Sequence, residues 1–358
     1  MKKIRVGILG ATGMVGQRFA TLLANHPWFE VVALAASPAS KGKIYQKAVK
    51  GRWKIDKEIP KTLKNVVIQS VEEDIDEIVR RVDLVFSALD LEKNQIKKIE
   101  EYYASKNMAV VSNNSTNRWV EDVPMIMPEI NPEHIKLIDV QRKNRGWKKG
   151  FIVVKPNCSI QSYVSILTTL HKFQPQKVHV VSMQSISGAG KTFDSWPEMV
   201  DNVIPNIAGE EEKSEKEPLK IWGKIRSNKI ALAKKPEISA TCIRIPSSNG
   251  HMTSVSVSFG IKPSKKQLLS AIKNYKNPIE KLHLPSAPRE FINYFEEENR
   301  PQSKLDRNLE NGMGISMGRL REDKHFDWKF IALSHNTIRG AAGGAILLAE
   351  LLVNKGYI

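Results

Sequence analysis

Short apolar runs alternate with helix-like segments along the first part of the chain. The run IRVGIL (4–9) is closed by a glycine-rich turn, and the apolar positions within 11–26 then repeat at the spacing of one helical face. Further strand-like runs occupy 30–37, 66–70, 83–89 and 109–113, and helix-like segments occupy 92–106 and 132–145. Alternating strands and helices predict parallel strands joined by crossover helices. We therefore expect an α/β fold in which residues 1–156 form a Rossmann-type domain with a doubly wound parallel sheet.

The pattern changes after KPN (155–157). Segments 177–187, 238–246 and 251–260 alternate between apolar and polar positions, which is typical of half-buried strands. We expect residues 157–336 to form an α+β catalytic and dimerisation domain around a mixed or antiparallel sheet. The apolar segment 337–358 is predicted to form a helix that packs back onto the first domain.

Composition limits the class of protein. The chain has 358 residues, a formal charge of +17 and two cysteines, too few for a disulfide framework. Its beginning carries no pattern of a secretory signal, and no apolar run reaches the roughly 18 residues that a membrane helix needs, so we expect a cytoplasmic protein. The lysines are scattered and accompany no nucleic-acid-binding motif, which favours small anionic ligands over nucleic acid or membrane.

Four glycines recur at three-residue intervals in GILGATGMVG (7–16), between the first strand and the first helix. Glycine lets the backbone approach a pyrophosphate closely, and a helix N-terminus offers free amides to it. The pattern predicts a dinucleotide site, with the following residues at the cofactor: Gly10, Thr12, Gly13, Met14 and Val15. A glycine-rich turn without a ligand is the alternative.

The end of the second strand bears on the choice of cofactor. An NAD site usually has an acidic residue there, whereas this chain reads ALAASPASKGK. Ser37, Ser40 and Lys41, with Lys43 nearby, are the candidates for binding a 2′-phosphate. The sequence thus favours NADP while leaving NAD possible, and the two lysines have the alternative interpretation of solvated surface residues.

Cys158 lies where an apolar strand gives way to the helix-like segment SIQSYVSILTTLHKF. A helix beginning at Cys158 would stabilise a thiolate, and such positions lower a cysteine pKa from about 8.5 to roughly 3.5–7.5. The alternative is an inert packing residue, which is the interpretation we favour for Cys242.

His251 is the candidate acid–base group. If SSNG (247–250) closes a hairpin with Pro246 opposite His251, Arg244 lies on the same sheet face. An imidazole would then neighbour a guanidinium able to bind a carboxylate in bidentate fashion.

Seven motifs in order resemble the aspartate-semialdehyde dehydrogenase family, in particular its archaeal and fungal branch, over nearly the whole chain. They are GATGMVG (10–16), SNNSTNRW (112–119), PNCSIQ (156–161), QSISGAG (184–190), GEEEKSEKE (209–217), IRIPSSNGH (243–251) and HNTIRGAAGGAILLAELL (335–352). The resemblance implies NADPH-dependent reductive dephosphorylation of L-aspartyl 4-phosphate to L-aspartate 4-semialdehyde, on the route to lysine, threonine and methionine.

The resemblance also implies residue roles. Cys158 would form an acyl-thioester, His251 would act as acid–base catalyst, and Gln184 would orient the reacting carbonyl. The implied substrate contacts are Arg244 for the carboxylate, Glu210 for the ammonium, and Arg118 with Lys213 for the phosphate. The implied contacts near the nicotinamide are Gly188, Gly190 and Asn336. No metal is implied, and the family forms homodimers or homotetramers.

Alternatives remain at this stage. A CoA-thioester reductase such as malonyl-CoA reductase has the same fold, but we expect it to have lost PNC and the acidic run that stand intact here. N-acetyl-glutamyl-phosphate reductase typically reads Pro-Gly-Cys-Tyr at its cysteine. A nucleotide-sensing or nucleic-acid-binding protein would not need Cys158, His251 and Arg244 together. The segment SPASKG lacks the arginine common in this branch at the 2′-phosphate, so dual use of NADP and NAD stays possible.

Overall fold

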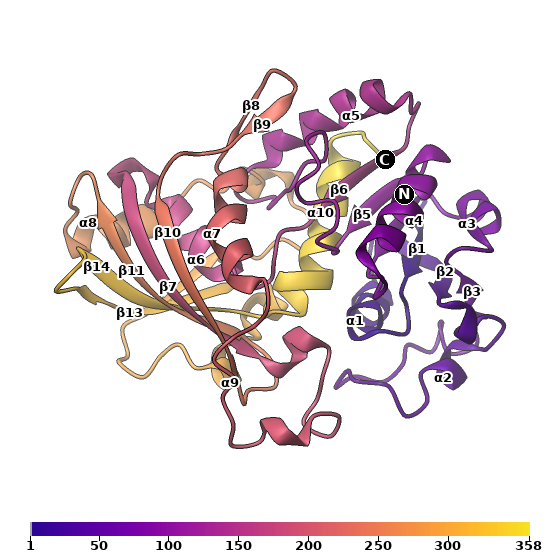
Figure 1. Ribbon diagram of the computed structural model, residues 1–358, viewed down its shortest axis with the longest axis horizontal. Helices are drawn as coiled ribbons and strands as arrows, with labels where there is room; N and C mark the ends of the chain where they lie inside the picture. The colour runs from indigo at the N-terminus through magenta and orange to yellow at the C-terminus, as the bar shows by residue number, and fades with distance from the viewer. Residues whose placement is uncertain (1) are drawn as a thin grey trace.

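The computed structural model describes residues 2–358, which form two parts, each built on a six-stranded sheet (Figure 1). In the first sheet the strands follow the order β3-β2-β1-β4-β5-β6, and all neighbours are parallel. The expected Rossmann-type sheet is confirmed. Its strands are β1 (Ile4–Leu9), β2 (Phe29–Ala36), β3 (Gln69–Ser70), β4 (Leu84–Ser87), β5 (Ala109–Ser112) and β6 (Phe151–Val154).

Strand β3 is shorter than the predicted 66–70 because the chain before it pairs elsewhere. Val66 and Ile68 exchange backbone hydrogen bonds with the segment 42–45, and Ile44 forms an isolated antiparallel bridge with Val67. This pairing leaves only two residues to extend the parallel sheet.

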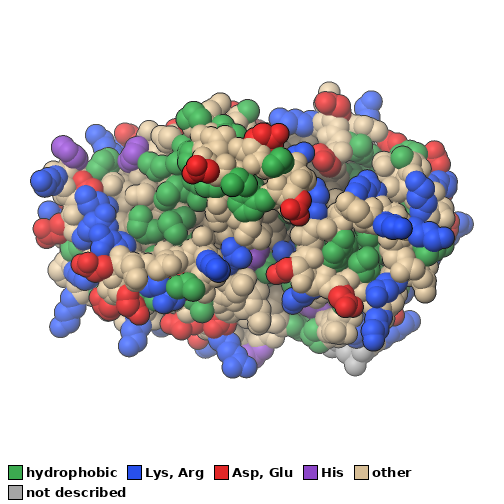
Figure 2. All heavy atoms as spheres, turned by 90° about the horizontal axis from the view of Figure 1, so that it is seen from below, with side chains coloured by type: hydrophobic (Ala, Val, Ile, Leu, Met, Phe, Trp, Pro, Cys, Tyr) green, Lys and Arg blue, Asp and Glu red, His purple; other side chains and the backbone are tan. Residues whose placement is uncertain are grey.

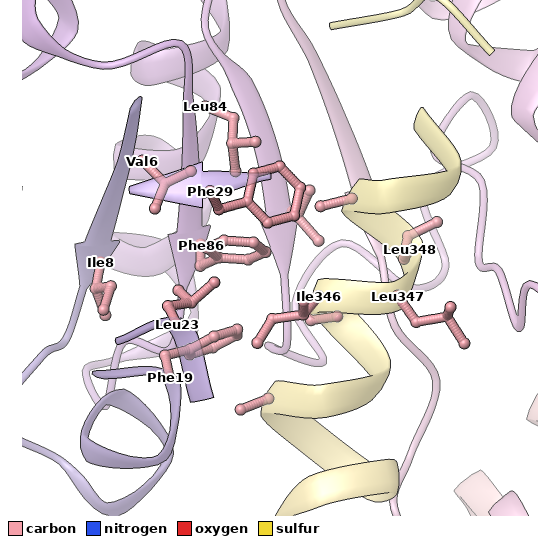
Figure 3. Close-up of a cluster of buried hydrophobic side chains, with 14 of the residues drawn as sticks. Val6, Ile8, Phe19, Leu23, Phe29, Leu84, Phe86, Ile346, Leu347 and Leu348 are labelled. Atoms are coloured by element: carbon pink, nitrogen blue, oxygen red, sulfur yellow. The ribbon is translucent and has the colours of Figure 1, made fainter. Parts of the chain in front are cut away.

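Helices cover both faces of the first sheet, so its strands are buried on both sides. One face packs on α1 and α10, and Phe19, Leu23 and Ile346 meet there (Figure 3). The other face packs on α3 and α4, with Ile78 and Tyr103 in its core. The helices of this part are α1 (Met14–Leu23), α2 (Tyr45–Ala48), α3 (Ile75–Arg81), α4 (Lys93–Ser105) and α5 (Leu137–Arg145), with 3₁₀ turns at η1 (Pro38–Ser40) and η2 (Pro132–Lys136).

The second sheet is mixed, with the order β10-β7-β11-β14-β13-β12. Strand β7 lies in the middle of the three predicted strands: it runs parallel to β10 and antiparallel to β11. The predicted hairpin between 238–246 and 251–260 is therefore wrong. The strands are β7 (Pro175–Ser185), β10 (Glu237–Ile245), β11 (His251–Phe259), β12 (Ile292–Phe295), β13 (Ile315–Glu322) and β14 (Trp328–Ser334), and a separate hairpin joins β8 (Lys224–Arg226) to β9 (Lys229–Ala231).

One face of the mixed sheet packs on helices, and the other is half-buried. Tyr163 and Leu167 of α6 and Leu268 of α8 lie in the core of the covered face. Helix α6 begins at Gln161, so the helix predicted to start at Cys158 starts three residues later. The helices here are α6 (Gln161–Thr169), α7 (Glu210–Ile221), α8 (Lys265–Lys273) and α9 (Ser303–Asp306), with 3₁₀ turns at η3 (His171–Phe173), η4 (Ile186–Ala189), η5 (Pro197–Met199), η6 (Glu280–Leu282) and η7 (Leu309–Gly312).

The C-terminal segment returns to the first part of the chain. A π-helical turn, η8 (Ile338–Ala342), leads into α10 (Gly343–Asn354), which lies between the two parts (Figure 1). The carboxylate of Glu350 contacts His26 Nε2 at 2.8 Å and accepts hydrogen bonds from Ser286 N. One buried carboxylate thus joins α10 to both parts.

The charged surface shows no continuous basic stripe on the face in view. Lys and Arg side chains are spread over both parts and interspersed with acidic ones (Figure 2). Within residues 2–358, no helix combines the length and apolar character needed to cross a bilayer. The same residues contain no cluster of three or more His, Cys, Asp or Glu side chains suited to a metal ion.

Candidate active site

Cys158 lies in the connection from β6 to α6, where the two parts of the molecule meet. Its side chain is partly exposed to a cavity of about 250 Å³. Backbone packing around it is close, because a Cβ on Gly340 would lie 2.6 Å from the Cβ of Cys158. The cavity is lined by Val15, Asn113, Asn114, Ser115, Arg118, Asn157, Cys158, Ser187, Gly188, Glu210, Lys213, Asn336, Thr337, Gly340 and Ala341.

The surroundings of Cys158 favour the neutral thiol. Burial, assisted by the Glu210 carboxylate, raises the thiol pKa to about 11 against the opposing charges of Lys155, Arg118 and Arg244. The prediction of a lowered cysteine pKa is wrong for this structure, since burial outweighs a helix that begins three residues away. The thiol proton must therefore leave as the sulfur bonds to a substrate.

His251 and Arg244 meet even though their strands do not pair. Arg244 lies opposite Gln184 on β7, and β11 begins on the other side of β7 with His251. Both side chains approach Gly188: a Cβ there would lie 2.7 Å from Arg244 Nη1 and 3.0 Å from His251 Nε2. The cavity at Cys158 is thus bordered through Gly188 by an imidazole and a guanidinium.

The imidazole of His251 is neutral and oriented. Burial, followed by the charge of Arg244, lowers its pKa to about 3. Ser185 N donates to His251 Nδ1 at 3.1 Å, so the ring proton of the neutral form belongs on Nε2. Among the described residues Nε2 has no hydrogen-bond partner, which leaves this N–H free for a bound molecule.

Glu210 is the centre of a second group of polar side chains. Its carboxylate accepts hydrogen bonds from Asn157 Nδ2 at 2.9 and 3.1 Å, from Gln184 Nε2 at 3.2 Å and from Lys213 Nζ at 2.8 Å. Burial opposes ionisation, but Lys213 and the amide donors hold the pKa of Glu210 below its usual value. The cavity therefore has a fixed negative charge beside the cations of Lys213 and Arg118.

Glu217 is a site residue that the sequence did not reveal. Its buried carboxylate pairs with Arg118 Nη1 at 2.9 Å and accepts a hydrogen bond from Asn157 N at 2.7 Å. Arg118 also donates to the carbonyl oxygens of Lys155 and Asn113. Glu217 of α7 thus fixes both Arg118, the predicted phosphate-binding residue, and Asn157, the residue before Cys158. The only sequence signal was the seven-residue separation of Glu217 from Glu210, which puts both on one helical face.

A second cavity, of about 470 Å³, follows the glycine-rich turn. Five predicted cofactor residues line it: Gly10, Thr12, Gly13, Met14 and Ser37. A Cβ on Gly10 would lie 2.2 Å from the Ala88 carbonyl oxygen, and one on Gly16 would lie 2.1 Å from that of Gly10. The turn therefore needs glycine at both positions, as the prediction of close backbone approach requires.

Two predicted 2′-phosphate contacts do not line this cavity. Ser40 is buried within the turn η1. Lys41 Nζ pairs with Glu73 at 2.9 Å and with Asp74 at 2.8 Å, so carboxylates already neutralise its charge. This geometry does not support the prediction that Lys41 supplies charge to the cofactor site. The sequence around Lys41 could not reveal its two acidic partners, because they lie 32 and 33 residues away.

Of the other four predicted cofactor residues, three lie on the Cys158 side, and Gly190 lines neither cavity. Val15, Gly188 and Asn336 line the cavity at Cys158. Gly190 has a positive φ of 68°, and its carbonyl oxygen accepts a 2.5 Å hydrogen bond from Lys54 Nζ. Asn336 accepts from Gly250 N at 2.9 Å and donates to Ser187 Oγ at 2.8 Å. Its amide therefore joins the turn after β7 to the loop before β11.

Comparison with known proteins agrees with this arrangement. Residues 5–138 match the family model described as semialdehyde dehydrogenase, NAD binding domain, and 167–339 match semialdehyde dehydrogenase, dimerisation domain. An Archaeoglobus fulgidus aspartate-semialdehyde dehydrogenase is 43% identical over 354 residues, 99% of each chain. The Saccharomyces cerevisiae enzyme of the same name is 39% identical over 371 residues, which cover 100% of this chain and 99% of that one.

Solved structures show the same fold. The crystal structure of aspartate-semialdehyde dehydrogenase with NADP from Candida albicans aligns with a TM-score of 0.89 and 37% identity, covering 100% of both chains. Identity at this level over 99% or more of each chain is sufficient to assign the family. The chain belongs to the aspartate-semialdehyde dehydrogenase family.

Proposed function

We propose that this chain catalyses the NADPH-dependent reductive dephosphorylation of L-aspartyl 4-phosphate to L-aspartate 4-semialdehyde, a step in lysine, threonine and methionine biosynthesis. The observation that carries the proposal is the cavity at Cys158, where a thiol lies within reach of groups of both charges and is bordered by a neutral histidine with a free Nε2–H. A nucleophile, a proton donor and charged anchors are the parts that acyl transfer needs.

NADP fits the second cavity. The glycine turn gives the backbone the close approach that a pyrophosphate requires, and no acidic residue stands at the end of β2 to repel a 2′-phosphate. When bound, the cofactor supplies hydride to the acyl carbon. Val15, Gly188 and Asn336 would lie nearest the nicotinamide, because they line the Cys158 cavity.

The thiol of Cys158 attacks the acyl carbon of the substrate, and its proton leaves with the phosphate. A thioester results. After hydride addition, the carbonyl carbon becomes tetrahedral, and His251 Nε2–H donates a hydrogen bond that stabilises the developing alkoxide. Collapse of the tetrahedral alkoxide breaks the carbon–sulfur bond and releases the aldehyde, and the thiolate of Cys158 takes up one proton from solvent, passed on by His251, to become the thiol again. Gln184, held by Glu210, would orient the carbonyl.

The charged residues would hold the two ends of the substrate. Arg244 donates to Ser185 O at 2.8 Å, which leaves the rest of its guanidinium for the substrate carboxylate. Glu210 is ionised and would bind the ammonium group, while Arg118 and Lys213 would bind the phosphate. Substrate binding would replace part of the Lys213–Glu210 contact.

The test is NADPH formation from NADP and L-aspartate 4-semialdehyde, with inorganic phosphate, without it, and with CoA in its place. We expect NADPH formation to depend strictly on phosphate, and we expect Cys158→Ala to form no NADPH. Turnover with CoA but not with phosphate would instead make the chain a CoA-thioester reductase. Repeating the assay with NAD in place of NADP measures the cofactor preference.

We further propose that the chain is a homodimer or homotetramer, with residues 157–336 forming the contact and residues 1–156 with 337–358 forming the cofactor domain. The outward face of the mixed sheet supports this proposal. Val181, Ser254 and Ile331 are cross-strand neighbours there and are only half-buried, as is Met252 beside them. Light scattering at micromolar concentration would test it, and a monomer would contradict it.

A further inference from the structure

The segment 52–54 brings two cations to the cofactor cavity. Arg52 and Lys54 both line the cavity together with Ser37, which follows β2. Within residues 2–358, no carboxylate lies within 4.0 Å of the charged nitrogens of either residue, whereas Lys41 has two such partners. Asp90 also lines the cavity and acts on Lys54 from a longer distance, so two cations share the cavity with one carboxylate and a net positive charge is left.

Contacts on both sides fix this segment. Gln17 of α1 is buried, and its Nε2 donates to Thr12 O at 2.8 Å and to Arg52 O at 2.9 Å. Gln17 Oε1 accepts from Lys54 N at 2.8 Å. The same side chain thus ties the segment to the glycine-rich turn, and Lys54 Nζ reaches across to Gly190 O in the second part.

The guanidinium of Arg52 is anchored and still available. Its Nη2 donates to Ala48 O at 2.6 Å, at the end of α2. The rest of its N–H groups have no hydrogen-bond partner among the described residues, and the residue is exposed. An arginine held at one nitrogen presents the others in a fixed geometry, which suits bidentate binding of a phosphate.

We propose that Arg52, positioned by Gln17 and Ala48, recognises the 2′-phosphate of NADP and gives the enzyme its preference over NAD. The end of β2 is where a dinucleotide site of this fold reads the ribose 2′ position, and Ser37 and Arg52 line the same cavity there. The proposal rests on the proposed use of NADP and assigns the role that Lys41 does not fill.

The experiment measures binding rather than turnover. NADPH and NADH are titrated separately into the full-length protein, and nucleotide fluorescence gives each dissociation constant for the unmodified chain and for Arg52→Gln, Arg52→Lys and Lys41→Gln. We expect Arg52→Gln to weaken NADPH binding about tenfold or more while NADH changes less than about twofold. Arg52→Lys should retain part of the preference, and Lys41→Gln should behave as the unmodified chain.

Three results would overturn the inference. The first is an unchanged ratio of the NADPH and NADH dissociation constants in Arg52→Gln. The second is an equal weakening of NADPH and NADH binding in that variant, which would indicate a displaced segment. The third is a loss of the preference for NADPH in Lys41→Gln. Selective weakening of NADPH in a protein that fails to oxidise L-aspartate 4-semialdehyde would support the role of Arg52 and overturn only the proposed function. A circular dichroism melt shows that each variant is folded.

Discussion

Replacing Glu217 with glutamine removes one charge from a buried ion pair. Glu217 and Arg118 are both buried, and the carboxylate also accepts from Asn157 N. Removing one partner of a buried pair typically costs about 3–5 kcal/mol, because the other charge is left without compensation. Glutamine retains one oxygen acceptor, so we expect the lower end, about 3 kcal/mol, in Glu217→Gln.

The matched control is Glu212→Gln on the same helix. Glu212 is exposed and pairs with Lys216 at 2.7 Å, a contact that solvent screens. Exposed pairs of this kind contribute about 0–1 kcal/mol, so this variant should melt close to the unmodified chain.

Two assays check the prediction. Thermal unfolding followed by circular dichroism should show a clearly lower midpoint for Glu217→Gln alone. Steady-state kinetics should show a raised KM for phosphate, because Arg118 loses one of the contacts that orient it, with a smaller change in KM for NADP. A Glu217→Gln protein with the stability and phosphate KM of Glu212→Gln would refute the reasoning.

Three further predictions concern the reacting groups. Cys158→Ala should lose all turnover while retaining the unmodified melting midpoint, and residual activity would remove the thioester mechanism. Arg244→Lys should chiefly raise the KM for the aldehyde, since lysine cannot make a paired contact with a carboxylate; an unchanged KM would contradict that role. The folded-state pKa of His251 is about 3, below the unfolded value of about 6.5. As the pH falls from about 6.5 towards 3, His251 becomes protonated in the unfolded chain but stays neutral in the folded chain, so the free energy of unfolding falls. His251→Gln should lessen that loss between pH 7 and pH 5 in denaturant titrations, and an equal loss in both proteins would contradict it.

The first sheet was predictable because its signals are local. A buried parallel strand reads as a continuous apolar run, and the glycine turn after β1 can be recognised from spacing alone. Period-two alternation, by contrast, identifies a strand without specifying its partner. The prediction paired 238–246 with 251–260, whereas β7 lies between them. Arg244 and His251 still meet, because β10 ends and β11 begins beside the C-terminal end of β7.

The network around Cys158 could not be predicted in the same way. Glu217 approaches Asn157 across 60 residues of sequence, and its burial depends on where α7 docks. The pKa of Cys158 depends on the same docking, since desolvation outweighs the charges that the motif supplies. Arg52 was hidden by its setting in a basic loop, where composition does not distinguish a positioned guanidinium from a solvated one.

The position of α10 has a consequence for synthesis of the chain. The helix covers the face of the first sheet that carries Phe29 and Phe86, beside Phe19 of α1, and it is translated after every strand of that sheet (Figure 3). Domains generally fold from the N-terminus during translation, but here the first part lacks one layer of its core until α10 has been made. An apolar sheet face therefore stays open until α10 has been translated and is a natural binding surface for a chaperone during that interval. Nascent chains halted before residue 343 should for this reason be more prone to aggregate than the 358-residue chain.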